Sequence, residues 1–541
     1  MNPQIAYESV HQTLRILIPE FIVLAAGVAM MTAAPFFRWP RRTWCAIGAG
    51  ALTAALLALL AVSGLRLQTD MYASVALNDS LGFYGRLVVL LSGLILLALA
   101  HDEPADDTAG EFFGAFLMIN AGAMLVTTAN ELVFLFVGLE LVSMPTYMLL
   151  YLTRRTSMTQ ETATKYFYLS IFSSGLLLYG LAFLYGVAGV SNLKALTTLC
   201  ALAADNSWFF PHPQLGLVAV VFVLAGLCFR VAAVPFHFYA PDVYQGSPTV
   251  LAALLSWVPK GVGFVAMVRA LTAVISVKGP DDPLVQKAVL ISWVVAAATM
   301  ILGNTLALLQ NNLKRLLAYS SIAHAGYLMI GVTVAFANGP KSGSVYYGCE
   351  SIFFYLVAYA LMTLGAFGVI IGLRTAGRGV ETVEDLAGLG STQPLPALAL
   401  AICLLSLSGI PPLAGFWGKF EIFASAFAAS PEDNSGPFTL LAVIGVLNAA
   451  VGAYYYLRIV VTMYLQPARQ TVVTRGGWPV ALAVGACASL SLILGLFPGP
   501  IARASRAAAQ AAVYSPPAQP QVAVRSGPSS SSSTKIPWVQ N

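Results

Sequence analysis

Four charged side chains lie inside long apolar runs of the sequence, far from the ends of those runs. They are Glu140, Arg230, Lys260 and Lys419. A charge at the centre of a membrane helix costs about 2.5–3.5 kcal/mol on insertion scales, so such residues usually face a bundle interior or a wet cavity. Their types and positions therefore indicate an ion pathway through a bundle of helices.

The two lysines suit proton transfer, because a desolvated lysine can exist charged or neutral near physiological pH. A carboxylate at the depth of Glu140 has to be neutral or paired with a buried base. Arg230 stays protonated, so we expect it to set the electric field or pair with Glu140 rather than carry protons. Simpler roles remain open, namely a structural ion pair for Glu140 and a base reaching the interface for Lys260.

Two histidines add to this set. His324 lies in the middle of an apolar segment, and His237 lies just after Pro235. Histidine titrates near neutrality and can relay protons, although a helix-packing role is nearly as reasonable for each. Hydroxyl groups near His324 could support a chain of waters: Ser320, Ser321, Tyr319 and Tyr327.

The composition is that of an integral membrane protein. Of 541 residues, 58% are hydrophobic and 9% are charged. The six cysteines are scattered without a CxxC pair, and no catalytic triad, nucleotide-binding loop or haem-ligand pattern is present. We therefore expect no metal and no cofactor bound by this chain, and no nucleic-acid partner.

About fourteen apolar segments are long enough to span a membrane. The expected fold is therefore an all-α polytopic membrane protein with about 14 transmembrane helices. The approximate spans are 15–37, 43–64, 78–100, 110–128, 130–152, 164–188, 215–239, 247–275, 286–310, 314–337, 346–373, 394–428, 437–464 and 477–498.

The orientation follows from the basic residues between these segments. If the N-terminus is outside, the inner loops hold about twice as many basic residues as the outer ones. Both termini are then expected on the outer side. The inner set is Arg38, Arg41, Arg42, Arg154, Arg155, Lys165, Lys314, Arg315, Arg374, Arg378, Arg469 and Arg475.

Two blocks of five helices, 110–275 and 286–464, indicate an internal repeat. Each block contains a proline break late in its course, near Pro235 and near Pro411. Five is odd, so successive blocks enter the membrane with opposite topology, as in transporters with inverted repeats. The remaining predicted parts are helices 1–3 (1–109), a last transmembrane helix (465–500) and a disordered tail rich in Ala, Pro and Ser (501–541).

Four motifs resemble one known family, the antiporter-like membrane subunits of complex I, the proton-pumping NADH:quinone oxidoreductase. The resemblance spans roughly residues 10 to 500 and is greatest to subunit N. The motifs are GLELVSMPTYML, VPFHFYAPDVYQGSPT, NLKRLLAYSSIAHAGYLMIG and SLSGIPPLAGFWGKFEIF.

This resemblance implies a row of charged residues and water through two half-channels. By motif, Glu140 matches the fifth-helix glutamate, Lys260 the eighth-helix lysine, His324 the tenth-helix histidine and Lys419 the twelfth-helix lysine. The seventh-helix position is usually lysine and here is Arg230, whose guanidinium could pair with Glu140 in bidentate geometry.

The resemblance also implies a bacterial inner-membrane complex. Flavin, iron–sulfur clusters, NADH and quinone are then expected on other subunits, with neighbouring antiporter-like subunits and lipid as the partners of this chain. Two alternatives stay open at this point. One is a subunit of a multisubunit cation/proton antiporter, and the other is a structural membrane scaffold.

Overall fold

The computed structural model describes residues 3–64, 74–152, 156–204, 213–275, 281–337, 344–375, 378–429 and 436–512. The helices are α1 (Pro3–Ile16), α2 (Ile18–Ala33), α3 (Arg41–Ser63), α4 (Ser80–Ala100), α5 (Ala109–Thr128), α6 (Leu132–Leu152), α7 (Ser157–Ala188), α8 (Leu193–Ala204), α9 (Pro213–Val231), α10 (Tyr239–Gly246), α11 (Thr249–Ile275), α12 (Pro283–Leu308), α13 (Leu313–Ala337), α14 (Ser344–Gly372), α15 (Leu389–Thr392), α16 (Pro394–Ser408), α17 (Ala414–Ala428), α18 (Gly436–Leu465), α19 (Trp478–Leu496) and α20 (Gly499–Ala512).

The all-α membrane fold is confirmed. Within the described residues, 12 helices are long and apolar enough to cross a membrane, and the pair Val10–Ile16 and Ile18–Ala33 makes a thirteenth span bent by 67°. The remaining segment expected from sequence, 394–428, is present as two short helices, α16 and α17. Every expected apolar segment therefore corresponds to helix in the structure.

Two spans are broken, as Pro235 and Pro411 predict. Pro259 was also expected to interrupt its helix, and that prediction was wrong, because α11 continues through it from Thr249 to Ile275. The first break separates α9 from α10 and contains Ala232 at φ 56° together with Pro235. The second separates α16 from α17 and begins with Gly409 at φ 87°, a left-handed conformation that glycine adopts without a steric penalty. Because proline cannot donate a backbone hydrogen bond, each break leaves carbonyl groups of the preceding helix open to other donors.

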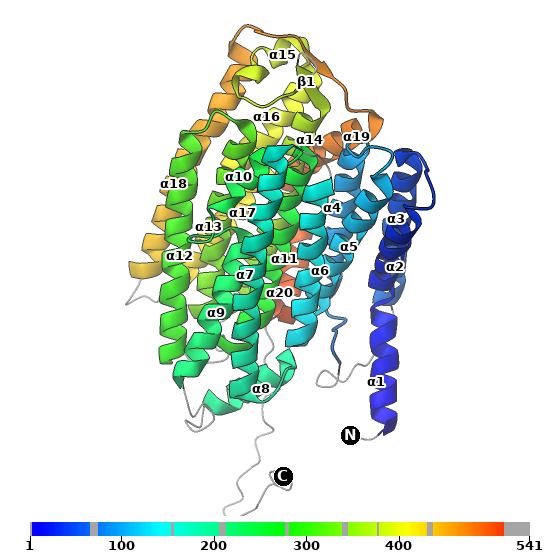
Figure 1. Ribbon diagram of the computed structural model, residues 1–541. Coiled ribbons are helices and arrows are strands. Elements are labelled where there is room, and N and C mark those ends of the chain that lie inside the picture. Colours follow the sequence, from blue (N-terminus) through cyan, green and yellow to red (C-terminus); the bar gives the residue numbers. More distant parts are fainter. Residues whose placement is uncertain are drawn as a thin grey trace, which may run out of the picture.

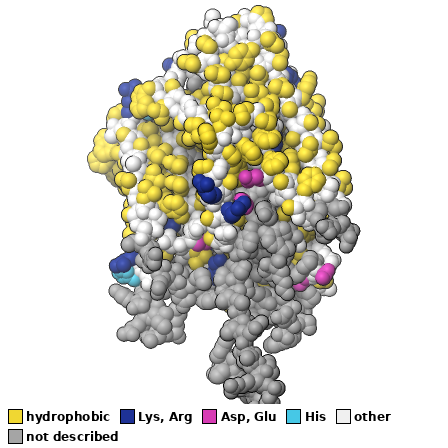
Figure 2. Space-filling view, turned by 180° about the vertical axis from the view of Figure 1, so that it is seen from behind, with side chains coloured by type: hydrophobic (Ala, Val, Ile, Leu, Met, Phe, Trp, Pro, Cys, Tyr) yellow, Lys and Arg dark blue, Asp and Glu magenta, His cyan; other side chains and the backbone are white. Residues whose placement is uncertain are grey.

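Three helices form the centre of the bundle. The membrane-spanning windows of α11, α13 and α14 are 100%, 94% and 94% buried, whereas that of α18 is 22% buried. In Figure 1, α12 and α18 lie at one side of the bundle and α2 and α3 at the opposite side. Figure 2 shows a rear face that is largely hydrophobic, with a few charged side chains in its middle.

One end of the bundle carries a small antiparallel sheet of β1 (Leu373–Thr375), β2 (Arg378–Gly379) and β3 (Val472–Thr474), in the order β2-β1-β3. This sheet joins two loops that the charge distribution predicts on the inner side. It lies at the top of Figure 1, whereas α8, which lies within a predicted outer loop, is at the bottom. The loops predicted on opposite sides of the membrane therefore lie at opposite ends of the bundle, as successive spans require.

The prediction of a disordered tail from residue 501 onward was wrong for its first part. Residues Gly499–Ala512 form α20, which packs against α4 and α14. The hydroxyls of Ser505 and Tyr84 are hydrogen bonded at 3.1 Å, and Arg506 pairs with Glu350 at 3.1 Å. Ala508 and Ala509 near the end of this helix are buried. A low mean hydropathy over the whole segment therefore did not reveal that one face of the helix is packed. Residues 513–541 lie outside the described residues.

Asp385 stabilises the loop that follows β2, which the charge distribution predicts on the inner side. Its carboxylate accepts hydrogen bonds from the backbone N–H groups of Glu381 and Thr382, both at 3.0 Å, and from Arg378 at 3.2 Å. Burial raises the pKa of Asp385, but these donors outweigh burial, and the pKa lies below its ordinary value. The contribution to stability is therefore present near neutral pH and is lost as the pH falls through the lowered pKa.

We expect Asp385→Ala to loosen this loop, because two backbone donors lose their acceptor. Hydrogen exchange of residues 378–386 should become about tenfold faster, which corresponds to losing about 1.4 kcal/mol of local stability. Glu384→Ala, at an exposed neighbouring position, is the control. Equal exchange in the two variants would contradict the role given to Asp385.

Candidate functional site

Glu140 and Arg230 form a buried ion pair between α6 and α9. Nη2 of Arg230 donates to Oε1 of Glu140 at 2.6 Å, and the side chains are 5% (Arg230) and 17% (Glu140) exposed. The expected bidentate geometry is absent. Nη1 instead donates to the carbonyl of Leu139 at 2.9 Å and to the hydroxyl of Ser143. The guanidinium is thus shared between the carboxylate and neutral acceptors on α6.

Ser174 of α7 completes this ion pair. Its hydroxyl donates to Oε1 of Glu140 at 2.5 Å and lies 3.3 Å from Nη2 of Arg230. The sequence reasoning missed both Ser143 and Ser174. Ser143 lies three residues after Glu140, on the same helical face, and that spacing was a usable signal. Ser174 comes from another helix, so only the fold could reveal it.

Lys260 lies on the fully buried helix α11 and points to α13. Its ammonium donates to the carbonyl oxygen of Ser321 and to the hydroxyl of Ser321, the latter at 2.5 Å. It also lies 5.3 Å from the ring centroid of Tyr359. Among the described residues no carboxylate pairs with Lys260, so neutral oxygens and an aromatic face stabilise its charge.

Gly263, one turn after Lys260, lets α11 approach the ion pair on α9. A Cβ atom added to Gly263 would lie 2.7 Å from Val231 and 3.5 Å from the Cβ atom of Arg230. Any larger residue would push α11 away from α9. The helix that carries Lys260 is therefore in direct contact with the helix that carries Arg230.

His324 of α13 lies between Lys260 and Lys419 and is 1% exposed. Nδ1 contacts the hydroxyl of Tyr355, and Nε2 lies 3.1 Å from the hydroxyl of Tyr456. The ring centroids of Tyr359 and Tyr327 lie 5.2 and 5.7 Å from that of His324. Hydroxyl groups on both ring nitrogens can exchange a proton with the imidazole in either direction.

Lys419 of α17 is held at the end of the broken helix. Its ammonium donates to the carbonyls of Leu407 and Ser408, both at 2.9 Å, and lies 5.0 Å from the ring centroid of Tyr327. These two carbonyls end α16, where the break leaves them without helical donors. A cation at a helix C-terminus is also favoured by the helix dipole.

The structure therefore joins three of the predicted residues in one buried line of polar groups. Hydrogen bonds join Lys260, Ser321 and Tyr359 in this line. Contacts with aromatic rings make the other steps, from Tyr359 to His324, from His324 to Tyr327 and from Tyr327 to Lys419. The hydroxyls of Tyr359 and Ser321 are hydrogen bonded at 2.8 Å. Of the hydroxyls expected near His324, that of Ser321 bonds to Tyr359 and that of Ser320 bonds to Tyr456. The hydroxyl of Tyr327 bonds to Asn304, and Tyr319 is only partly buried at the edge of the core.

Three tyrosines that contact His324 were missed from the sequence, namely Tyr355, Tyr359 and Tyr456. Tyr355 and Tyr359 are four residues apart, so they share one face of α14, and this spacing was visible in the sequence. Tyr456 lies on α18, and its approach to His324 depends on how the second block folds.

His237 lies apart from this line. It is in the break between α9 and α10, its side chain is partly exposed, and its Nδ1 atom is buried without a hydrogen-bond partner among the described residues. None of the described contacts joins His237 to Lys260, His324 or Lys419. Its role in a relay stays a prediction.

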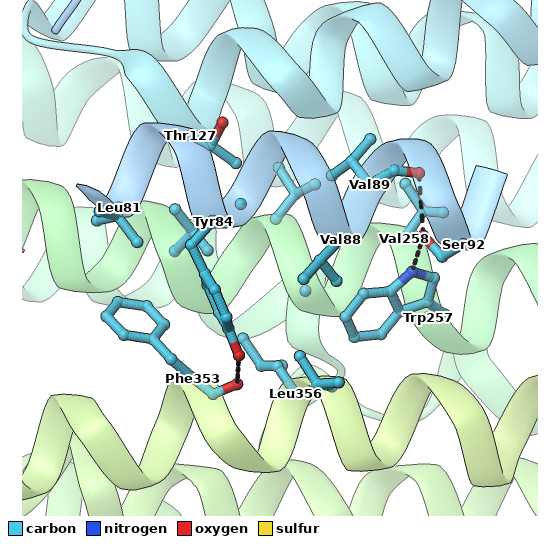
Figure 3. A pocket seen from close by; sticks show the side chains of 15 residues that line it. Leu81, Tyr84, Val88, Val89, Ser92, Thr127, Trp257, Val258, Phe353 and Leu356 are labelled. Atoms are coloured by element: carbon cyan, nitrogen blue, oxygen red, sulfur yellow. Dashed lines mark hydrogen bonds between the residues drawn. The ribbon is translucent and has the colours of Figure 1, made fainter. Parts of the chain in front are cut away.

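A separate apolar cavity of about 40 Å³ lies on the other side of α11, between α4 and α14. Figure 3 shows that its few polar groups bond to one another or to backbone. Trp257 donates to the Ser92 hydroxyl at 2.8 Å, and Tyr84 donates to the Phe353 carbonyl at 3.1 Å. Such a lining gives water few partners, so the polar route from Lys260 lies toward α13.

Comparison with known proteins places this geometry in a family. Residues 129–447 match the family model described as the transmembrane part of NADH:quinone oxidoreductase and Mrp antiporters. The chain belongs to this NADH:quinone oxidoreductase/Mrp antiporter family.

Curated relatives in this family match nearly the whole chain. NADH-quinone oxidoreductase subunit N of Trichlorobacter lovleyi is 36% identical over 504 residues, covering 90% of this chain and 95% of that protein. The subunit N of Paramagnetospirillum magneticum is 35% identical over 498 residues, covering 91% and 97%.

Solved structures of the family have the same fold. A chain of respiratory complex I from Thermus thermophilus has a TM-score of 0.72 and 32% identity, covering 91% of this chain and 100% of that chain. A chain of the Mrp complex from Dietzia has a TM-score of 0.75 at 21% identity, covering 94% and 98%, which shows likeness of fold alone.

Ser321 offers a test of the buried line. We expect Ser321→Ala to slow proton transport about tenfold, because Lys260 and Tyr359 both lose the hydroxyl that joins them. The measurement is proton uptake by vesicles that contain the protein with its native partners.

The matched control is Ser292→Ala on α12. That hydroxyl is equally buried but donates only to Val289 of its own helix. If the two variants transported protons at the same rate, the hydroxyl of Ser321 would have no place in the route.

Proposed function

We propose that this chain is the proton-translocating subunit N of a respiratory NADH:quinone oxidoreductase. The observation that carries the proposal is the buried line from Lys260 through His324 to Lys419, which links two protonatable amines across the centre of the bundle. Subunit N relatives at 35–36% identity over nine-tenths of the chain support the assignment.

In this proposal the chain transports protons and carries out no redox chemistry itself. Electrons pass from NADH to quinone in other subunits, where flavin and iron–sulfur clusters are expected. Among the described residues no group of three or more histidine, cysteine or acidic side chains is placed to hold a metal ion. The partners are the other membrane subunits, including neighbouring antiporter-like ones, and the lipid of the bacterial inner membrane.

The ion pair between Glu140 and Arg230 is the input of the relay. While the pair is closed, its charges largely cancel. When a neighbouring subunit draws Glu140 away from Arg230, the uncompensated guanidinium faces α11 and disfavours the protonated form of Lys260. The proton then leaves Lys260 along the hydrogen bonds to Ser321 and Tyr359. Waters bridge the remaining steps, from Tyr359 to His324 and from His324 to Lys419.

The energy required is within reach of such a change. Moving one charge against about 100 mV costs about 2.3 kcal/mol. A tenfold change in proton affinity corresponds to about 1.4 kcal/mol, so a change of about fiftyfold at Lys260 covers that cost. Arg230 keeps its own proton throughout, which makes it an electrostatic element of the relay.

Replacing Lys260 tests this function directly. Lys260→Met removes the titratable group and keeps an unbranched side chain of similar length. We expect assembly of the complex to continue while proton pumping through this chain is lost. The readout is protons pumped per NADH oxidised in proteoliposomes, with the amount of assembled complex as the control. Normal pumping by an assembled Lys260→Met complex would overturn the relay.

A multisubunit cation/proton antiporter remains the second candidate, because the matching family model includes Mrp antiporters. Gentle solubilisation of the native membrane distinguishes the two. A particle with flavin, iron–sulfur clusters and NADH:quinone activity is expected. A particle of membrane subunits alone, with sodium-dependent antiport, would move the function to that class.

A further inference from the structure

A long apolar groove lies on the outside of the bundle between α14, α16 and α19. Its volume is about 670 Å³, within the range of small-molecule sites. Small residues make it deep, including Gly368 and Gly372 on α14 and Gly485 and Ala488 on α19. It is distinct from the buried line, since none of the relay residues lines it.

The length of the groove matches one leaflet of a bilayer. Its lining on α19 runs from Val480 to Leu492, which is about 18 Å of helix at about 1.5 Å per residue. Half of a hydrocarbon core of about 30 Å is about 15 Å. The groove begins at the level of Gln393 and Thr474, next to the small sheet, and ends within the membrane.

The open end of the groove presents one exposed cation, Arg475, while the nearby carboxylate of Asp102, close to Gly477, pairs with Arg41 at 3.4 Å. Arg475 lies between the lining residues Thr474 and Gly476, its side chain is exposed, and its backbone N–H donates to the carbonyl of Gly372 at 2.9 Å. Arg374 of β1 does not line the groove, because its guanidinium donates to the backbone carbonyls of Ile371 and Leu373 at 3.1 and 3.2 Å. This is the end that the charge distribution of the loops predicts on the inner side.

An exposed tryptophan lies at the same level. Trp478, the first residue of α19, is 78% exposed. Tryptophan is enriched where a membrane protein meets the headgroup region, because its ring is apolar and its N–H is polar. The cationic mouth, the tryptophan and the apolar groove below them follow the order of headgroup, interface and acyl chain.

We propose that this groove binds one anionic phospholipid of the inner leaflet, with an acyl chain between α16 and α19 and the phosphate at Arg475. The inner leaflet is the leaflet rich in anionic lipids, and arginine binds phosphate through charge-assisted hydrogen bonds.

The dimensions favour a lipid over a transmembrane helix of another subunit. A packed helix would cover α19 over the whole membrane thickness, whereas the groove stops about half-way. Below it, the large apolar side chains Leu496 and Phe497 remain 53% and 68% exposed. A single acyl chain fits both the length and the end point of the groove.

Gly485 allows the groove to be filled without disturbing the bundle. A Cβ atom added there meets nothing within 4 Å, so Gly485→Leu places its side chain in the groove. A Cβ atom added to Gly50 on α3 also meets nothing within 4 Å, and Gly50 lies outside the groove, so Gly50→Leu is the matched control. Arg475→Gln removes one charge at the mouth and leaves the groove open.

The experiment uses the assembled complex reconstituted in phosphatidylcholine vesicles. The probe is phosphatidylglycerol with a photoactivatable group near the end of one acyl chain, and labelled peptides are mapped by mass spectrometry. We expect labelling of α16 and α19 at residues that line the groove. It should fall about tenfold in Gly485→Leu and stay unchanged in Gly50→Leu. In Arg475→Gln the preference for this probe over a phosphatidylcholine probe should be lost.

Two results would overturn the proposal. Labelling of α19 that is no stronger than on α3 and indifferent to Gly485→Leu would mean only exchanging bulk lipid at this surface. Cross-links from α19 to another subunit, with no lipid label, would mean that a protein covers the groove. Because the readout is lipid labelling, it is independent of whether Lys260→Met stops pumping.

Discussion

The ion pair between Glu140 and Arg230 is the interaction on which the rest of the relay depends. Burying one of these charges alone in the bundle would cost several kcal/mol, so each charge compensates the other. The pair is made of a single direct hydrogen bond, and Ser143, Ser174 and the Leu139 carbonyl are further partners of the guanidinium. Nε of Arg230 is buried without a hydrogen-bond partner among the described residues. An arrangement of this kind can open partly without leaving either charge bare.

The two lysines are held differently, and the difference fits their places in the line. Lys260 is held by Ser321 on an intact helix, whereas Lys419 is held by carbonyls that the break after α16 leaves free. Both lie near tyrosine rings, which stabilise a cation without binding its proton permanently. The broken helix therefore has a definite physical role, because it supplies acceptors at mid-depth where an intact helix would have none.

Much of this could be predicted from the sequence. Apolar run length predicted the spans, and the prolines predicted both breaks. The positions of Glu140, Arg230, Lys260 and Lys419 deep in apolar runs predicted that these side chains face the interior of the bundle, because a charge exposed to lipid at that depth is costly. His237 shows the limit of that reasoning, since a histidine beside a break need not point into the line. The helix α20 shows another limit. Its alanine-rich sequence predicts a disordered tail, and only the fold shows that its small residues pack against α4 and α14.

Contacts between helices that are distant in the sequence could not be predicted from the sequence alone. Tyr456 meets His324 across 132 residues, and Ser174 meets Glu140 across 34. Nothing in the local pattern around Tyr456 or Ser174 distinguishes them from other polar residues in apolar helices. Their roles depend on how the two five-helix blocks pack, which single-sequence periodicity does not specify.

The central claim is that the pair between Glu140 and Arg230 controls protonation at Lys260. The most direct test is a double-mutant cycle on protons pumped per NADH, with Glu140→Gln, Arg230→Gln and the double variant in assembled complex. The account predicts that each single variant lowers pumping strongly and that the double variant is no worse than the poorer single one, because both changes break one control element. Losses that simply add would contradict it and would mean that the two residues act independently.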